Sequence, residues 1–239
     1  METKFSAEPM ELKKANGIIN NFIKSCSHDF KSPLTSIEGL VMIAGYSTNQ
    51  EEVNHCLTLI QQCALNMLNS IHKLEEYTIV QHRKLCNDDI QADQLVDKVV
   101  KEYSKEIDQQ QIVVSTRIVQ YSPWISDEQC NYLVLKNLVE NAVNFIDREK
   151  KPNWINIKID VSDEFVSLEV SDNGVGIADD EKEKIFEPFH RSSTQSKGSG
   201  LGLFLVKGII EKLKASVTLS SIQKVGSSFL ISIPNNKTL

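Results

Sequence analysis

A histidine followed directly by a carboxylate, His28-Asp29, stands near the start of this 239-residue chain. A neutral imidazole nitrogen is a good nucleophile, and it exchanges its proton near neutral pH. Asp29 could accept or orient that proton. Pro33 lacks the N–H group that a helix would pair with the carbonyl of Asp29, so we expect the helix to loosen beside the histidine. A lone surface histidine gives the same pattern, so the pair does not by itself establish chemistry.

Two asparagines, Asn137 and Asn141, lie four residues apart in a helical pattern and therefore share one helix face. Amide oxygens are hard ligands that suit Mg²⁺, which keeps several waters and bridges substrate phosphates. Paired helical asparagines also occur as caps or surface residues. The pair therefore carries little weight alone.

A first glycine segment, Asp172-Asn173-Gly174-Val175-Gly176-Ile177, follows a predicted strand. Its glycines allow the backbone to approach a ligand closely. Asp172 can accept a hydrogen bond from an exocyclic amine such as that of adenine. An ordinary glycine turn is the alternative interpretation.

A second glycine segment, Gly198-Ser199-Gly200-Leu201-Gly202-Leu203, opens a predicted helix. Free N–H groups at a helix start attract phosphate oxygens, although G-x-G-x-G is weak evidence that matches neither the P-loop nor the Rossmann spacing. Before it, Phe186 and Phe189 flank Pro188 and could anchor a lid that opens and closes.

A long apolar repeat must position His28. From Ile19 to Ala44, apolar residues recur with gaps that alternate between four and three, which is a heptad seam. His28 falls at position f, where its imidazole points away from the seam. After a break at residues 45–49 and a capping-box pattern at Thr48, a second seam runs through residues 53–78 and includes Leu57 and Ala64.

Two heptad helices joined by a short turn predict an antiparallel hairpin. One hairpin cannot bury apolar faces this wide, whereas two copies can do so as a four-helix bundle. We therefore expect a homodimer. The alternative is a hairpin packed on the second domain of its own chain.

Beyond a linker at residues 85–89, the pattern changes to mixed helix and strand. Helices are expected near residues 92–107, from the cap residue Asp127 to about residue 146, and near residues 201–213. Strands are expected at residues 112–119, 154–161, 165–171, 216–221 and 227–233. Strands adjacent in sequence, with helices to cover them, predict an α+β two-layer domain.

Composition narrows the class of protein. A hydrophobic content of 41% and a charged content of 24% are ordinary for a soluble globular chain, and the net charge of −6 argues against a nucleic-acid-binding face. The five cysteines form no C-x-x-C pair, which suggests reduced thiols. No apolar run approaches the length of a membrane span, so we expect no membrane contact within this chain.

In order and spacing, these segments resemble the boxes of sensor histidine kinases of two-component signalling. Residues 28–34 resemble the H box, 137–142 the N box, 172–177 the first glycine box, 186–189 the F box and 198–203 the second glycine box. Each box is weak alone, but five in the right order form a strong signal. The resemblance covers residues 15–235.

The resemblance implies an all-α helical hairpin that forms a four-helix bundle in the dimer, followed by an α+β two-layer sandwich of Bergerat ATPase type. The hairpin, residues 1–86, would be the dimerisation and histidine-phosphotransfer domain, and residues 87–239 would be the catalytic ATP-binding domain. By analogy, Asn141 ligates Mg²⁺ with support from Asn137, Asp172 reads the adenine amino group, and residues 186–197 form the ATP lid. The implied ATP-binding residues are Asn137, Asn141, Asp172, Gly174, Gly176, Ile177, Phe186, Phe189, Arg191, Lys197, Gly198, Ser199, Gly200, Leu201, Gly202 and Leu203.

Two positions depart from the family pattern. Asn144 stands where the family often has a lysine, so a cationic phosphate contact is lost unless Arg191 or Lys197 compensates. Ser32 stands where many members have threonine or asparagine that orients water for dephosphorylation of the partner. Ser32 still has a hydroxyl, so phosphatase activity stays open.

The sequence thus predicts an ATP-dependent protein-histidine kinase with His28, Asp29 and Ser32 as its catalytic residues. His28 would take the γ-phosphoryl group of Mg·ATP and pass it to an aspartate on the receiver domain of a response regulator. The alternatives are a nucleotide-binding signalling scaffold with a degenerate kinase step, favoured by Asn144, and another ATPase of the superfamily, which needs no presented histidine. We expect a cytoplasmic chain that either belongs to a longer membrane-bound kinase or receives its input from another protein.

Overall fold

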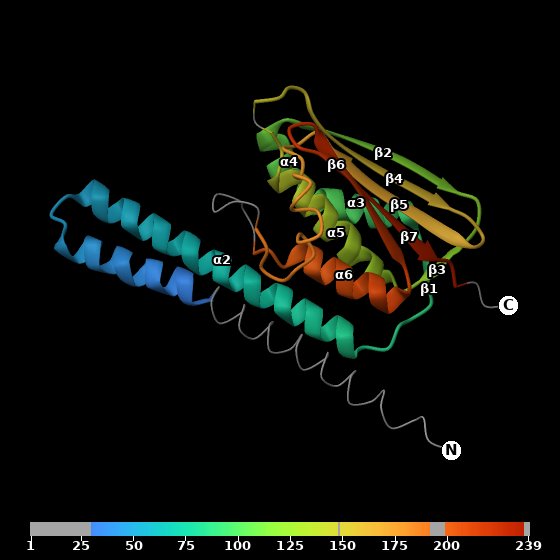
Figure 1. Cartoon of the computed structure of the whole chain (residues 1–239), viewed down its shortest axis with the longest axis horizontal. Coiled ribbons are helices and arrows are strands. Elements are labelled where there is room, and N and C mark those ends of the chain that lie inside the picture. The colour runs from blue at the N-terminus through green and yellow to red at the C-terminus, as the bar shows by residue number, and fades with distance from the viewer. Residues whose placement is uncertain (1–29, 148, 192–198, 237–239) are drawn as a thin grey trace, which may run out of the picture. The chain divides into compact units, whose positions relative to one another are not determined.

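The computed structural model describes residues 30–147, 149–191 and 199–236. The chain divides into two compact units, Met1–His72 and Lys73–Leu239. Figure 1 shows helices alone in the described part of the first unit and a sheet with covering helices in the second. The prediction of a helical hairpin followed by an α+β sandwich is confirmed.

In the first unit, helical residues 30–46 are followed by a short turn and then by helix α2 (Gln50–His82), which continues into the second unit. The side-chain oxygen of Asn49 accepts a hydrogen bond from the N–H group of Glu51 at 2.9 Å. The cap is therefore Asn49, one residue after the predicted Thr48. His28 and Asp29 lie outside the described residues.

The less exposed stripe of α2 keeps Val53, Ile60 and Met67 of the predicted seam, which are half-buried, but Cys56 and Cys63 take the places predicted for Leu57 and Ala64. Cys56 is buried and Cys63 is half-buried, whereas Leu57 and Ala64 are exposed. The apolar surface of α2 is wider than one seam, and adjacent stripes follow the same heptad spacing. Sequence periodicity therefore could not select which stripe faces the other helix.

The second unit is built on a five-stranded sheet in the order β2-β4-β5-β7-β6. Its members are β2 (Ile112–Gln120), β4 (Asn153–Val161), β5 (Phe165–Asp172), β6 (Ser216–Ile222) and β7 (Gly226–Pro234). Strands β2 and β4 are parallel, and the other neighbours are antiparallel. A second, two-stranded sheet pairs β1 (Asp88–Ile90) with β3 (Trp124–Ser126).

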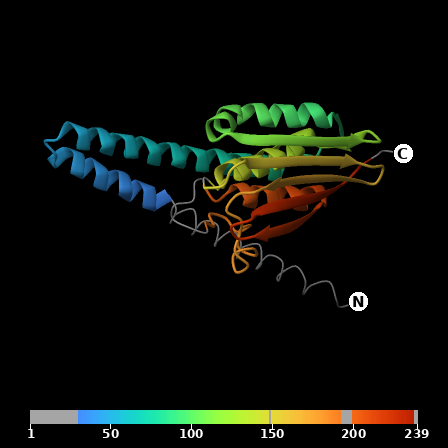
Figure 2. The same cartoon turned by 90° about the horizontal axis from the view of Figure 1, so that it is seen from above.

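Helices cover one face of the large sheet, as the two views show (Figures 1 and 2). They are α3 (Ala92–Glu102), α4 (Ser104–Gln110), α5 (Glu128–Asn144) and α6 (Gly202–Leu213). Alternate residues of β4 are buried, including Ile155, Ile157 and Ile159 at 0% exposure, because successive side chains of a strand point to opposite faces. The buried side chains form the core between the two layers.

Two elements differ from the sequence prediction. The helix expected at residues 92–107 is interrupted at Tyr103, which leaves helical geometry (φ −103°, ψ 10°) and separates α3 from α4. Part of the expected linker is strand β1, whose partner β3 lies far along the chain. A three-residue strand has too short a pattern to be read without its partner.

The end of α2 and the segment after it pack within the second unit. Tyr77 of α2 stacks on Phe204 of α6 with ring centroids 4.7 Å apart, and Lys212 donates to the carbonyl of Gln81 at 2.8 Å. The compact unit therefore begins well before residue 87, where we placed the start of the ATP-binding domain. That placement stays a prediction about function.

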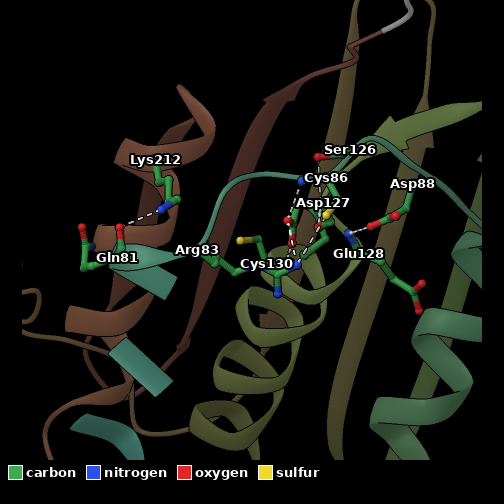
Figure 3. Close-up of polar contacts among 10 residues, drawn as sticks. Gln81, Arg83, Cys86, Asp88, Ser126, Asp127, Glu128, Cys130 and Lys212 are labelled. Atoms are coloured by element: carbon green, nitrogen blue, oxygen red, sulfur yellow. Dashed lines mark hydrogen bonds and ion pairs between the residues drawn. The ribbon is translucent and has the colours of Figure 1, made fainter. Parts of the chain in front are cut away.

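A buried carboxylate ties this segment to α5. Asp127, the N-cap of α5, accepts a hydrogen bond from the N–H group of Cys130 at 2.9 Å, as its predicted capping role requires. Its second oxygen accepts from the N–H group of Cys86 at 3.0 Å and lies 3.1 Å from the Arg83 guanidinium (Figure 3). The linker and the first turn of α5 are therefore held by one side chain.

The described cysteines, Cys56, Cys63, Cys86 and Cys130, are free thiols. A transmembrane helix is absent from the described residues, because no helix there combines enough length with enough apolar sequence to span a bilayer.

Candidate nucleotide-binding site

A pocket in the second unit is lined by residues of α5, of the loop after β5 and of the segment that leads into α6. The lining consists of Lys73, Glu140, Asn141, Asn144, Phe145, Asp172, Ile177, Ile185, His190, Arg191, Ser199, Gly200, Gly202, Leu203, Ser227 and Phe229. Apolar side chains and a few charged or amide groups thus meet in one cavity, as in sites for small ligands.

Helix α5 presents a polar face to this pocket. Glu140, Asn141 and Asn144 line it because residues three and four apart lie on the same side of a helix. Asn137, one turn earlier, is fully buried and donates to the carbonyl of Leu133 at 2.7 Å. Its side-chain oxygen accepts a hydrogen bond from Lys73.

The side chain of Asn141 on this face is not fully hydrogen-bonded. Within the described residues, its buried side-chain nitrogen has no hydrogen-bond partner, which is unusual for a buried polar atom. No cluster of three or more His, Cys, Asp or Glu side chains suited to a metal occurs in the described part of the chain. Mg²⁺ at nucleotide sites takes only one or two protein ligands plus phosphates, so an amide in this pocket fits it.

Asp172 ends β5 at the pocket. Its carboxylate accepts hydrogen bonds from the backbone N–H groups of Gly174, at 2.8 Å, and of Ser227. Burial nevertheless raises the pKa of Asp172 to about 6, while these N–H groups and the positive charge of Lys150 oppose the rise. Above that pH the half-buried Asp172 carboxylate is an acceptor, which an exocyclic amine could use.

The glycines of the first glycine segment make close approaches to protein backbone. A Cβ atom on Gly174 would lie 2.2 Å from the carbonyl oxygen of Phe145, at the end of α5. Gly176 has a positive φ of 66°, and a Cβ there would lie 2.0 Å from the carbonyl oxygen of Ile222. These close approaches fix the loop after Asp172, and the approach of its backbone to a ligand stays a prediction.

Two described parts of the segment before α6, near Phe189 and near Gly200, are in contact. The N–H group of Phe189 donates to the carbonyl of Gly200 at 3.0 Å, and Gly200 has a positive φ of 69°. His190 pairs with Glu181 at 2.5 Å and, with Arg191, lines the pocket. Two residues of the expected lid, His190 and Arg191, therefore line the cavity, as do Ser199 and Gly200 beyond its end.

Comparison with known proteins shows which proteins the chain resembles. A profile described as histidine kinase-, DNA gyrase B- and HSP90-like ATPase matches residues 126–237. The heme sensor protein HssS of Staphylococcus saprophyticus is 23% identical over 238 residues, which are 97% of this chain and 50% of that protein. Sensor protein RprX of Bacteroides fragilis is 25% identical over 235 residues, which are 93% of this chain and 44% of the length of RprX.

The solved structure of histidine kinase ThkA, in complex with response regulator protein TrrA, shares the fold. Its TM-score is 0.75 at 21% identity, and the match covers 99% of this chain and 68% of that one. The chain therefore resembles sensor proteins over nearly its whole length and shares the fold of a solved histidine kinase. It spans about half the length of the curated relatives that it matches.

The structure brings together only part of the ATP-binding set implied by the resemblance to histidine kinases. The residues of that set that line the pocket are Asn141, Asp172, Ile177, Arg191, Ser199, Gly200, Gly202 and Leu203. Those that do not line it are Asn137, Gly174, Gly176, Phe186, Phe189 and Leu201. Lys197 and Gly198 lie outside the described residues, and Ser32 is exposed on the helix of residues 30–46.

Two residues that line the pocket, Lys73 and His190, are not among the residues that the sequence singles out. Lys73 approaches Glu140 at 2.5 Å with its side chain only 11% exposed, and it also contacts Asn137. Nothing in the spacing of Lys73 signals this contact, because 64 residues separate it from Asn137. His190 directly follows the F box, and that position was the available signal.

Proposed function

We propose that the chain carries the catalytic core of an ATP-dependent protein-histidine kinase. The observation that carries the proposal is the pocket in which Asn141 and Asp172 meet the second glycine segment, in an ATPase-family domain that follows a helical hairpin. An amide for a metal, a half-buried carboxylate for an amine and a helix start for phosphates together match Mg·ATP. Residues 1–86 would be the phosphotransfer domain and residues 87–239 the ATP-binding domain.

The reaction would proceed by displacement at the γ-phosphorus. An imidazole nitrogen of His28 forms the new P–N bond as the bond to the β–γ bridging oxygen breaks, and ADP leaves. The imidazole proton passes to Asp29, the neighbouring carboxylate. The phosphoryl group then moves from His28 to an aspartate of a response regulator, which regenerates the neutral histidine.

The pocket's own residues would hold the nucleotide in place for this transfer. Asp172 orients the adenine ring, and the N–H groups at the start of α6, with Arg191, face the phosphates. Asn141 would hold Mg²⁺, with Asn137 supporting it from the same helix face; the bound ion would neutralise phosphate charge. Positioning and charge neutralisation supply most of the catalysis.

We also propose two protein partners. A second copy of the chain would cover the apolar side chains that the hairpin leaves exposed, which include Leu57 and Leu68. A response-regulator receiver domain would dock near His28, as the reported complex of ThkA with its regulator suggests. Ser32 would support dephosphorylation of that regulator.

The scaffold alternative rested on Asn144, which lines the pocket where the family often has lysine. Lys73 and Arg191 line the same pocket, so that substitution does not leave it without positive charge. We therefore favour an active kinase over a degenerate one.

Incubation with γ-labelled ATP tests the proposal. We expect label on the protein that acid removes, because phosphohistidine is acid-labile whereas phosphoserine survives. His28→Gln should abolish the label and leave ATP binding intact, since the acceptor and the nucleotide pocket lie in different units. His55→Gln, which alters a histidine on α2, is the matched control and should label normally. Acid-stable label, or acid-labile label on His28→Gln, would overturn the assignment.

A further inference from the structure

Lys150, in the connection between α5 and β4, has an unusual set of partners. Its ammonium group donates to the backbone carbonyls of Asn173 at 3.0 Å, Gly174 at 2.9 Å and Val225 at 3.2 Å. A lysine side chain has three donors and no acceptor, so these carbonyls can take all three. Asp147 lies 3.7 Å away and balances the charge.

The three carbonyls belong to two loops, and each loop lies next to a backbone N–H group that donates to the Asp172 carboxylate. Gly174, whose carbonyl accepts from Lys150, donates its N–H group to the Asp172 carboxylate at 2.8 Å. Val225 lies two residues before Ser227, whose N–H group is the other backbone donor to that carboxylate. Lys150 therefore joins the loop after β5, which supplies one donor, to the turn that leads into β7, whose second residue, Ser227, supplies the other.

The packing around these donors is too tight to tolerate much displacement. A Cβ atom on Gly226 would lie 2.0 Å from the carbonyl oxygen of Asp172, and one on Gly174 would lie 2.2 Å from that of Phe145. The backbone approaches so closely only while the two loops keep their spacing. An ammonium group bonded to both loops is suited to maintain it.

We propose that Lys150 is a positioning residue of the nucleotide site, which holds the two loops so that Gly174 and Ser227 direct their N–H groups at Asp172. This inference rests on the proposed role of Asp172 in reading the nucleotide base. Lys150 does not line the pocket, so it acts on the ligand through Asp172. Its second effect is electrostatic, because its charge favours the ionised form of the carboxylate.

The carboxyl titration of Asp172 gives a direct test. Burial raises the pKa of Asp172 to about 6, and the charge of Lys150 opposes that rise, so removal of the charge must move the midpoint to higher pH. In the ligand-free full chain, Lys150→Met should raise the midpoint of the Asp172 carboxyl ¹³C signal by roughly half a pH unit or more. Asp172→Asn assigns the signal.

The neighbouring Lys151→Met is the matched control, because it removes the same charge from an exposed side chain next in sequence and should leave the midpoint unchanged. The other charged or titratable groups that line the pocket are Lys73 on α2, Glu140 on α5, and His190 and Arg191 before α6. All four are unaltered in both variants, so their titration contributes equally to each.

ATP binding measured by calorimetry at about pH 8 isolates the positioning effect of Lys150 from its effect on the protonation of Asp172. At that pH the Asp172 carboxyl is ionised in the parent and in the Lys150 and Lys151 variants. There Lys150→Met should still weaken binding by roughly threefold or more, since the two loops are no longer joined. As the pH is lowered towards about 6.5, the ATP affinity of Lys150→Met should fall more steeply than that of the parent, because more of the variant's Asp172 carboxyl is protonated. Lys150→Gln provides the same comparison should Lys150→Met fail to fold.

Equal carboxyl midpoints and equal ATP affinities in the Lys150 and Lys151 variants would overturn the proposal. Failure of the base-reading role has a different signature, in which Asp172→Asn binds ATP as the parent does. In that case the carboxyl titration still decides whether Lys150 acts on Asp172.

Discussion

The two compact units differ in how completely they bury their own apolar residues. In the second unit, Ile155, Ile157 and Ile159 of β4 are 0% exposed beneath the covering helices. In the first unit, Leu34 at 53%, Leu57 at 55% and Leu68 at 51% remain open to solvent. The second unit thus completes its core within one chain, whereas the hairpin leaves apolar surface that a second copy can cover.

The same contrast separates the two halves of the proposed chemistry. The residues that line the proposed nucleotide pocket come from α5, the glycine segments and β7, among others, all within the second unit. The proposed acceptor histidine belongs to the unit that leaves large apolar side chains exposed. Damage to the pocket should therefore spare assembly, and damage to the hairpin surface should spare nucleotide binding.

The largest effect should come from Asn141→Ala. Loss of the proposed metal ligand should lower autophosphorylation by roughly a hundredfold or more, about 2.7 kcal/mol in the barrier, while the dimer persists. Asn156→Ala, which alters an asparagine of β4 that bonds to Ser115, is the control and should retain activity. Kinase activity within about twofold of the parent, roughly 0.4 kcal/mol, would remove Asn141 from the mechanism.

Leu68→Asp should have the next largest effect. It should weaken the proposed dimer without changing nucleotide binding. The side chain is exposed in the isolated hairpin, so the change leaves the hairpin folded, but it would bury a charge in the proposed dimer. The dissociation constant of the dimer should rise by roughly a hundredfold, because each copy contributes one buried charge. Light scattering measures the change, and ATP affinity should not alter.

Val113→Asp is the control for that experiment, because Val113 is equally exposed, at 57%, but lies on β2 of the other unit. An unchanged dimer in Leu68→Asp and also in Leu57→Asp would show that this stripe is not the subunit interface.

Asp127→Ala should destabilise the second unit moderately. It removes the N-cap of α5 and the acceptor for Cys86 and Arg83, so the free energy of unfolding should fall by about 1–2 kcal/mol. Urea unfolding followed by the fluorescence of the buried Trp124 reports on this unit. Asp160→Ala, on the outer side of β4, should change stability little, and equal loss in both variants would refute the capping role.

Ser32→Ala should have the smallest effect, confined to phosphatase activity. If the hydroxyl holds water for attack on a regulator's phospho-aspartate, dephosphorylation should fall about tenfold while autophosphorylation stays within about twofold. Ser36→Ala is the control, because the Ser36 hydroxyl bonds back to the carbonyl of Ser32 at 3.1 Å. Equal loss of both activities in Ser32→Ala would indicate a damaged helix.

Local pattern was sufficient to predict most elements from the sequence. The heptad spacing predicted the hairpin, Asp127 predicted the start of α5, and alternation predicted β4 and β5 to within one residue at each end. The order of the five boxes predicted the family before any coordinates. These signals work because helix and strand periods, caps and turns depend on neighbours in sequence.

Only the tertiary structure decided the contacts between distant segments. Lys73 reaches Glu140, Lys150 joins two loops around Asp172, and β1 finds its partner β3 across more than thirty residues. The tertiary structure also decided that Cys56, and not Leu57, turns inward. Such choices depend on the space and charge that remote residues provide, and a spacing along the chain carries no record of them.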